Sequence, residues 1–167
     1  MLHISNKILV SEYDPSWPQH FRLEAVLGNR ALRIEHTGST SVPGLAAKPI
    51  IDILLVVSNS ADEEAYALAL EATGYVLRIS EPDWYEHRMF KGPDTPINLH
   101  VLSLDCPEIY RILLLRDWLR THPVDRDLYE SCKLALAARE WRSVDEYANA
   151  KTAVIEEILA RACLDRK

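Results

Sequence analysis

Residues 34–53 combine side chains that can hold phosphate with a carboxylate set in an apolar segment. The small and hydroxyl residues of this stretch are Gly38, Ser39, Thr40 and Ser41. Glycine lets the backbone approach a ligand closely, and hydroxyls and backbone N–H groups can bind phosphate oxygens. Lys48 follows in the same loop and can neutralise phosphate charge. We therefore predict a phosphate-binding loop, against the alternative of a tight turn with no ligand.

Asp52 interrupts an otherwise apolar run at residues 50–57. The length and β-branched composition of this run predict a strand that is covered on both faces. An ionised carboxylate in such a strand is costly to bury unless it is hydrogen-bonded, paired or bound to metal. Asp52 can therefore bind a divalent cation or cap the neighbouring Gly-Ser backbone, and both alternatives stay open at this point.

A sheet and its helices must position the loop and Asp52, and the hydrophobic pattern predicts both. Strands are expected at residues 8–13, 50–57, 75–79, 84–91 and 97–103. Helices are expected at residues 18–32, 62–72, 107–121, 123–141 and 144–163. Residues 92–96 contain the glycine and prolines of a turn, which predicts a hairpin of the last two strands. The pattern predicts an α/β (α+β) fold: a small mixed β-sheet flanked by helices, with a helical C-terminal third.

Size and composition limit the class of protein. A chain of 167 residues is long enough for one ordinary domain, and we expect a single domain over residues 1–167. The net charge of −6 argues against binding to duplex nucleic acid, which requires a basic surface. Three scattered cysteines form no C-x-x-C pair, which favours a reducing compartment. Because the first residues contain no long apolar segment, we expect a cytoplasmic protein without a membrane span.

The spacing from Gly38-Ser39 to Asp52 resembles the signature of the nucleotidyltransferase superfamily. The run at residues 36–53, with Val-Pro-Gly-Leu-Ala-Ala-Lys-Pro inside it, is similar to that of the GrpB-type family. A similar domain is fused behind the kinase domain of some dephospho-CoA kinases. The resemblance covers nearly the whole chain. It implies a nucleotidyltransferase-like fold in which Gly-Ser holds the triphosphate of a nucleotide and an Asp-x-Asp pair binds metal.

Leu54 departs from that superfamily pattern, because it stands two residues after Asp52, where active members have a second carboxylate. Two-metal phosphoryl transfer uses cations about 3.5–4 Å apart, generally bridged by carboxylates. With Leu54 one bridging ligand is missing. Either other residues replace it, or the chain holds a single metal or only binds a nucleotide.

His100, Glu86 and His87 are the candidate replacements. His100 lies on the strand where the superfamily usually supplies a third carboxylate, and it shares a face with Asn98 because side chains alternate along a strand. Pairing Lys91 with Pro96 would set His87 opposite His100, and a shift by one residue would set Glu86 there instead. The sequence leaves the two registers open.

These alternatives define the predicted chemistry of the site. Asp52, His100 and Glu86 are the predicted catalytic group, and Asp52, His100 and His87 are the predicted metal ligands. The resemblance implies a divalent metal, Mg²⁺ or Mn²⁺, whereas ligation by imidazole favours Mn²⁺ or Zn²⁺ over Mg²⁺.

Lys133 and Lys151 are further candidates for phosphate binding. Both resemble family positions on the last helices, and each follows a tyrosine by four residues, Tyr129 and Tyr147 respectively. Residues four apart share a helix face, so each lysine is expected beside an aromatic ring. The alternative is an ordinary solvated helix face.

Three functions are compatible with these patterns. The leading hypothesis is a metal-dependent nucleotidyltransferase that binds a nucleoside triphosphate and transfers a nucleotidyl group to an acceptor. The alternative is a non-catalytic module for a nucleotide or a CoA-like small molecule, as Leu54 suggests. In a third interpretation the C-terminal helices form a protein-interaction surface, and the chain is a monomer or a homodimer.

Overall fold

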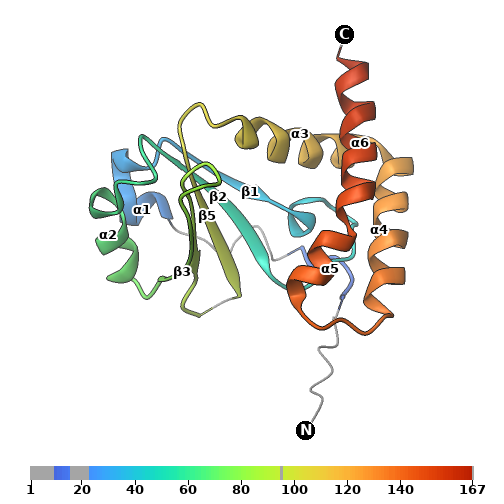
Figure 1. Cartoon of the computed structure of the whole chain (residues 1–167), viewed down its shortest axis with the longest axis horizontal. Helices are drawn as coiled ribbons and strands as arrows, with labels where there is room; N and C mark the ends of the chain where they lie inside the picture. Colours follow the sequence, from blue (N-terminus) through green and yellow to red (C-terminus); the bar gives the residue numbers. More distant parts are fainter. Residues whose placement is uncertain (1–9, 16–22, 95, 167) are drawn as a thin grey trace, which may run out of the picture.

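A five-stranded mixed sheet forms the centre of the structure, with the strands in the order β1-β2-β5-β4-β3 (Figure 1). The structure is a computed structural model that describes residues 10–15, 23–94 and 96–166. The strands are β1 (Arg33–Thr37), β2 (Ile51–Val57), β3 (Val76–Glu81), β4 (His87–Lys91) and β5 (Ile97–Ser103). β2 and β5 run parallel, whereas the other neighbouring strands run antiparallel.

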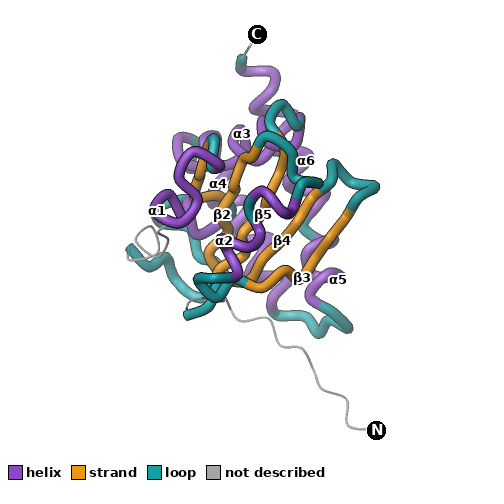
Figure 2. Tube along the Cα trace, turned by 90° about the vertical axis from the view of Figure 1, so that its left-hand side faces the viewer, coloured by secondary structure: helices purple, strands orange, loops and turns teal. Residues whose placement is uncertain are grey.

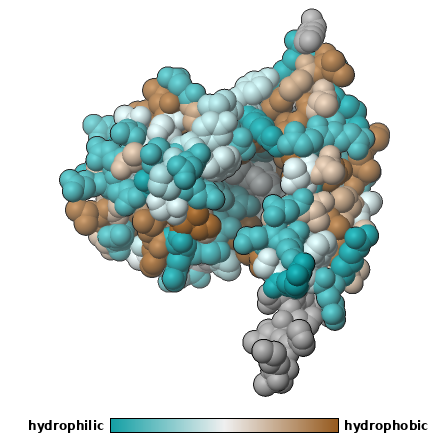
Figure 3. All heavy atoms as spheres, in the orientation of Figure 1, coloured by the Kyte–Doolittle hydropathy of each residue, from teal (hydrophilic) through white to brown (hydrophobic). Residues whose placement is uncertain are grey.

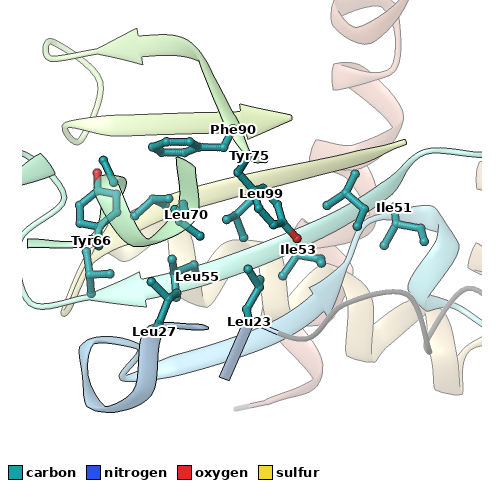
Figure 4. Close-up of a cluster of buried hydrophobic side chains, with 14 of the residues drawn as sticks. Leu23, Leu27, Ile51, Ile53, Leu55, Tyr66, Leu70, Tyr75, Phe90 and Leu99 are labelled. Carbon is teal, nitrogen blue, oxygen red and sulfur yellow. The ribbon is translucent and has the colours of Figure 1, made fainter. Parts of the chain in front are cut away.

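One face of the sheet packs against two short helices, α1 (Leu23–Leu27) and α2 (Ala67–Glu71), which lie in front of it in Figure 2. Because side chains alternate along a strand, the odd-numbered residues of β2 and β5 face these helices. They form the largest core cluster, whose labelled members in Figure 4 include Leu23, Leu27, Ile53, Leu55, Leu70, Phe90 and Leu99. Each buried Leu, Ile or Phe side chain stabilises the fold by about 1.5–3 kcal/mol.

The opposite face packs against α3 (Pro107–Thr121). Leu54 and Val56 of β2 and Leu102 of β5 contact Leu113 there. The same face becomes polar toward the beginning of β2, where Asp52 lies. Helix α3 therefore covers the apolar part of this face, and the polar part is the candidate location of a functional site.

The C-terminal helices are α4 (Pro123–Ala137), α5 (Val144–Ala150) and α6 (Thr152–Asp165), and α3 contacts both α4 and α6. Val42 and Leu45, from the loop after β1, are buried against Leu119, Tyr129 and Ile158 of these helices. The helices thus lie beside the end of β1 and the beginning of β2 (Figure 1). None of the helices within the described residues combines the length and the apolar character needed to cross a membrane.

The expected mixed sheet, flanked by helices and followed by a helical C-terminal third, is confirmed. Five expected elements need correction. The strand expected at 84–91 begins at His87, and the helix expected at 62–72 is a 3₁₀ turn at Glu63–Ala65 followed by α2. Residues 33–37, expected in the loop, form edge strand β1, whose antiparallel pairing with β2 was not predicted. The helix expected at 123–141 ends at Ala137, after which the indole of Trp141 donates to the carbonyl of Leu136. The helix expected at 144–163 is two helices, separated at Lys151.

Two further expectations fall partly outside the described residues. Of the helix expected at 18–32, residues 18–22 lie outside them; the described part is α1 followed by a 3₁₀ turn at Gly28–Arg30. Of the strand expected at 8–13, residues 8 and 9 lie outside them, and Ser11 forms one isolated bridge with Ala47.

Candidate functional site

Gly38 and Asp52 meet at the junction of β1 and β2. Asp52 pairs with Thr37 of β1 on one side and with Asn98 of β5 on the other. Gly38 directly follows β1 with a φ of 67°, a left-handed conformation that favours glycine. Its backbone lies so close to Asp52 that an added Cβ would stand 2.6 Å from Oδ2. The Gly-Ser…Asp spacing therefore places a backbone against a carboxylate, across two antiparallel strands.

Asp52 is a partly exposed carboxylate that lies within hydrogen-bond distance of two side chains. Its side chain is 33% exposed. The amide of Asn98 donates to Oδ1 at 3.2 Å, and Nε2 of His100 lies 3.3 Å from the same oxygen. Burial opposes ionisation, but the contacts with His100 and Asn98 outweigh it and hold the pKa of Asp52 below its usual value. Asp52 is therefore ionised at neutral pH.

His100 belongs to a hydrogen-bonded chain of four side chains that ends on Glu81. Its Nδ1 lies 3.0 Å from Nε2 of His87, and Nδ1 of His87 lies 2.7 Å from Oε2 of Glu81. The two imidazole rings are stacked, with centroids 5.2 Å apart. The chain Glu81–His87–His100–Asp52 crosses the face of β3, β4, β5 and β2, in that order.

One arrangement of protons along these four side chains leaves a position for a cation between His100 and Asp52. Two neutral imidazoles carry two N–H groups, and ionised carboxylates at both ends only accept. If His87 donates to Glu81 and His100 donates to His87, then Nε2 of His100 presents a lone pair to Asp52. Two acceptors then face each other, and the contact requires a third proton or another cation between them. Burial lowers the pKa of His87, although Glu81 opposes this shift.

Three lysines from separate elements gather around two buried tyrosines beside Asp52. The Nζ atoms of Lys48 and Lys151 lie 5.3 and 4.9 Å from the ring centroid of Tyr147. Nζ of Lys133 lies 4.9 Å from the ring centroid of Tyr129. These distances are typical of cation–π contacts. The prediction that Tyr129 and Tyr147 share a helix face with the lysines four residues later is confirmed.

Burial and mutual repulsion make these ammonium groups easier to deprotonate. Burial, with the charges of Lys151 and Lys48, lowers the pKa of Lys133 to about 7, although Glu130 opposes the shift. Burial and Lys48 lower the pKa of Lys151 to about 8, against the attraction of Asp52. The pKa of Lys48 is lowered too, chiefly by burial. An anion placed among the lysines would relieve this repulsion.

Helices α3 and α4 hold the loop between β1 and β2. The carboxylate of Glu130 accepts from the backbone N–H of Ala46 at 2.7 Å, and the ammonium of Lys133 donates to the carbonyl of Ala46. Nε of Arg120 donates to the carbonyl of Ser41 at 2.9 Å. Lys133 therefore orders the loop as well as contributing charge.

The predicted loop residues differ in their contacts. The hydroxyl of Thr40 bonds Nε2 of His36 at 2.8 Å, and the hydroxyl of Ser41 donates to the carbonyl of Gly38 at 2.6 Å. Both side chains are buried, whereas Gly38 is exposed and Ser39 is half-buried. The hydroxyls of Thr40 and Ser41 therefore hold the turn together, and Gly38 and Ser39 are the part of it that a ligand can reach.

Glu86 does not join Asp52, and neither expected hairpin register is correct. Met89 pairs with His100, so the register is offset by two residues from the one that would set His87 opposite His100. An offset of two keeps His87 on the face of His100, because the side-chain period is two. Glu86 lies in the turn before β4 with a φ of 51°, and its carboxylate accepts from Arg88 at 3.1 Å.

Leu54 is a core residue. It is fully buried against Leu102 and Leu113 under α3. The position at which the sequence resemblance pointed to a missing carboxylate is thus used for packing. Across residues 10–15, 23–94 and 96–166, no three His, Cys, Asp or Glu side chains converge as a metal-binding group.

A cleft of about 340 Å³ lies between the polar part of the sheet face and helices α3, α4 and α6. The surface is hollowed between the sheet and the C-terminal helices (Figure 3). The polar wall of the cleft includes Thr37, Gly38, Asp52, His87 and His100. Its apolar wall includes Val42, Leu102, Ile112, Leu115, Leu119 and Ile155. The candidate cation position therefore opens onto a largely apolar space.

Comparison with known proteins identifies the family. The model of the GrpB protein family matches residues 7–161. The chain belongs to the GrpB family. The crystal structure of GrpB from Enterococcus faecalis superposes with a TM-score of 0.82 at 32% identity, covering 95% of this chain and 99% of that one.

Relatives in the GrpB family include separate proteins and parts of longer ones. A UPF0157 protein of Halalkalibacterium halodurans is 59% identical over 160 residues, which are 93% of this chain and 82% of that protein. A dephospho-CoA kinase of Mycolicibacterium paratuberculosis is 29% identical over 180 residues, covering 89% of this chain but 44% of the kinase. The expected resemblance to the GrpB-type family and to such kinases is confirmed.

Sequence reasoning missed two groups of this GrpB-family site. Glu81 was not considered, although it pairs with His87 across the β3–β4 hairpin. It is the last member of the hydrogen-bonded series Glu81–His87–His100–Asp52. Asn98 was placed on the face of His100 but was given no role, and its amide holds Asp52. The five-residue spacer between β3 and β4 was the available signal, because it indicates a hairpin.

Proposed function

We propose that this GrpB-family protein binds a nucleoside triphosphate with a divalent cation and transfers a nucleotidyl group to an acceptor. The observation that carries the proposal is the convergence of Asp52, His100, the exposed Gly38 backbone and the lysine cluster at one end of the sheet. A carboxylate–imidazole pair beside three clustered lysines suits a metal-bound polyphosphate better than an uncharged ligand.

The donor atoms present fit a cation that takes its other ligands from phosphate. Ligands about 2.0–2.2 Å from one ion lie roughly 2.8–3.1 Å apart in an octahedral shell and roughly 3.3–3.6 Å apart in a tetrahedral one. Nε2 of His100 and Oδ1 of Asp52 are 3.3 Å apart. Two protein ligands suffice where substrate phosphates complete the shell. The nitrogen donor favours Mn²⁺ or Zn²⁺ over Mg²⁺. When bound, the ion would neutralise phosphate charge and polarise the phosphorus centre.

The chain's own residues would act mainly by positioning and by charge. Gly38 and Ser39 would offer backbone N–H groups to the phosphates, while Lys48 and Lys151 would stabilise the charge of the departing pyrophosphate. Lys133 would hold the loop and add to the positive potential. Glu86 is not part of this group.

The test is calorimetric titration of ATP, CTP, GTP and UTP with and without Mn²⁺, together with an assay of pyrophosphate release. We expect Mn²⁺-dependent binding that Asp52→Asn abolishes and that Asp127→Asn, an exposed change on α4, leaves intact. Binding or turnover that is the same in wild type and Asp52→Asn would contradict the proposal.

A second candidate is the non-catalytic module for a nucleotide or a CoA-like molecule. The burial of Leu54 in the core supports it, because a second catalytic metal then lacks its bridging carboxylate. The chain is similar to 44% of a protein named dephospho-CoA kinase, and CoA is therefore added to the ligands that are titrated. This candidate predicts saturable binding of a nucleotide or CoA without pyrophosphate release and little altered by EDTA.

A further inference from the structure

The space beside Asp52 is divided by charge. The lysines of the cluster, Lys48, Lys133 and Lys151, are not among the described residues that line the cleft, whereas Asp52 and His100 are. The cation position therefore separates a positively charged region from an apolar one. A phosphate chain suits the first region, and the second requires a different kind of group.

The guanidinium of Arg116 also lines the cleft, but its charge is already neutralised. It donates to Glu35 at 2.5 Å, to Asp117 at 2.8 Å and to the carbonyl of His36 at 3.2 Å. Two carboxylates and a carbonyl leave this cation little attraction for an anion. The cleft wall formed by α3 therefore does not favour a phosphorylated ligand.

The shape and lining of the cleft suit a small apolar body. Ile112, Leu115 and Leu119 of α3 form one wall and Ile155 of α6 adds to it. Its volume of about 340 Å³ is near the lower end of the range for small-molecule sites, roughly 300–1,000 Å³. The polar side chains that such a ligand would meet include Asp52 and His100, with Thr37, His87 and Tyr129 also in the lining.

An aromatic side chain lies at the cleft and remains accessible. Trp84 lines it, is 44% exposed, and contacts the ring of His87 edge-on with centroids 5.1 Å apart. The two residues that follow, Tyr85 and Glu86, have φ values of 55° and 51°. Consecutive non-glycine residues in this region are unfavourable, and such strain clusters at functional sites.

We propose that this cleft binds an uncharged alcohol with a compact apolar body, whose hydroxyl lies beside Asp52 and His100 as the acceptor of the nucleotidyl group. The acceptor role rests on the proposed function, whereas binding in the cleft does not. In the transfer the hydroxyl oxygen bonds to the α-phosphorus. The bond from that phosphorus to the bridging oxygen breaks, pyrophosphate leaves with the electron pair, and the hydroxyl proton passes to solvent.

The test uses two probes that share a benzyl group, benzyl alcohol and benzyl phosphate, and observes them by saturation-transfer NMR with the full chain. We expect transfer to benzyl alcohol and a weaker signal for benzyl phosphate. Filling the cleft by Ile112→Phe, or from α6 by Ile155→Phe, should abolish the benzyl alcohol signal. Val124→Phe, at an exposed position of α4 away from the cleft, should retain it. Circular dichroism identifies the filled variant that remains folded.

Titration of ATP with Mn²⁺ into the same variants separates this proposal from the proposed function. A cleft-filled variant that remains folded should keep its affinity for ATP and should no longer bind benzyl alcohol. No transfer to benzyl alcohol, or transfer that both filled variants retain, overturns binding in the cleft. Joint loss of ATP and alcohol overturns the acceptor role, because the cleft then holds part of the nucleotide. Alcohol binding without ATP binding in wild type supports the cleft and refutes the proposed function.

Discussion

The backbone of Gly38 lies against the carboxylate of Asp52, so closely that a Cβ on Gly38 would stand 2.6 Å from Oδ2. Real Cβ atoms do not approach an oxygen this closely, so the carboxylate would have to move. Asp52 is also held by Asn98 and His100 through its other oxygen. The glycine is therefore a spatial requirement of the site as well as a conformational one.

Gly38→Ala is expected to abolish Mn²⁺-dependent nucleotide binding, because the methyl group displaces Asp52. The matched control is Gly44→Ala in the same loop, whose φ is 79° but whose added Cβ would meet no atom within 4 Å. Gly44→Ala should lose about 1–2 kcal/mol of unfolding free energy from its positive φ, and Gly38→Ala should lose more, because a φ of 67° with a ψ of −173° is a conformation that essentially only glycine adopts. Calorimetry and urea denaturation measure the two effects. Equal affinity in both variants would refute the spatial argument.

Leu54→Asp is expected to destabilise the protein without creating a second metal ligand. The change removes a fully buried side chain, which costs about 2–5 kcal/mol, and buries a carboxylate at a further cost of several kcal/mol. Leu54→Met is the control and should cost less than about 1.5 kcal/mol. The urea midpoint gives the stability. A folded Leu54→Asp protein with raised Mn²⁺ affinity would show that Leu54 does not belong to the core.

Glu81→Gln is expected to weaken Mn²⁺ binding by roughly 10–100-fold, as is typical for groups that orient a metal-bound histidine. An amide can donate to His87 as well as accept, so the hydrogen-bond direction along His87 and His100 is no longer unique. Electron paramagnetic resonance of Mn²⁺ measures the affinity, and ¹⁵N NMR of the imidazoles reports the tautomer without metal.

Glu71→Gln, at an exposed position of α2, is the control for Glu81→Gln and should match wild type in both measurements. The melting temperature of either variant should change little, because Glu81 is about half exposed. An unchanged His100 tautomer and unchanged Mn²⁺ affinity in Glu81→Gln would exclude a positioning role.

ATP affinity is expected to fall as the pH rises from 7 to 9. In the free protein the pKa is about 7 for Lys133 and about 8 for Lys151. Burial and the charge of neighbouring lysines lower both pKa values, whereas Glu130 and Asp52 oppose the shifts of Lys133 and Lys151 respectively. A bound polyphosphate favours the charged forms and raises both pKa values. Binding at pH 8 should therefore take up protons.

Calorimetry in two buffers of different ionisation enthalpy measures the proton uptake. Lys151→Met should reduce it, and Arg139→Met, at an exposed position just after α4, should not. Proton release on binding at pH 8, or no proton exchange, would contradict the assignment of the lysine cluster to the phosphates.

The sequence by itself determined which residues share the site at short range. The sequence placed Asp52 beside the Gly-Ser backbone, although the pairing of β1 with β2 that brings Gly38 to Asp52 was not predicted. His100 faces the same way as Asn98 because side chains alternate. Tyr129 and Lys133 touch because residues four apart share a helix face. Each of these relations depends on local geometry, which residue spacing encodes directly.

Only the tertiary structure decided the long-range relations. The β4–β5 register set Met89 opposite His100, brought His87 and Glu81 into one chain with Asp52, and left Glu86 outside it. A strand pair accepts several registers of similar local energy, and packing against the rest of the fold selects one. For the same reason, the burial of Leu54 under α3 depends on how distant segments pack, which spacing along the chain does not encode. The same holds for the gathering of lysines from a loop, from α4 and from the junction of α5 and α6.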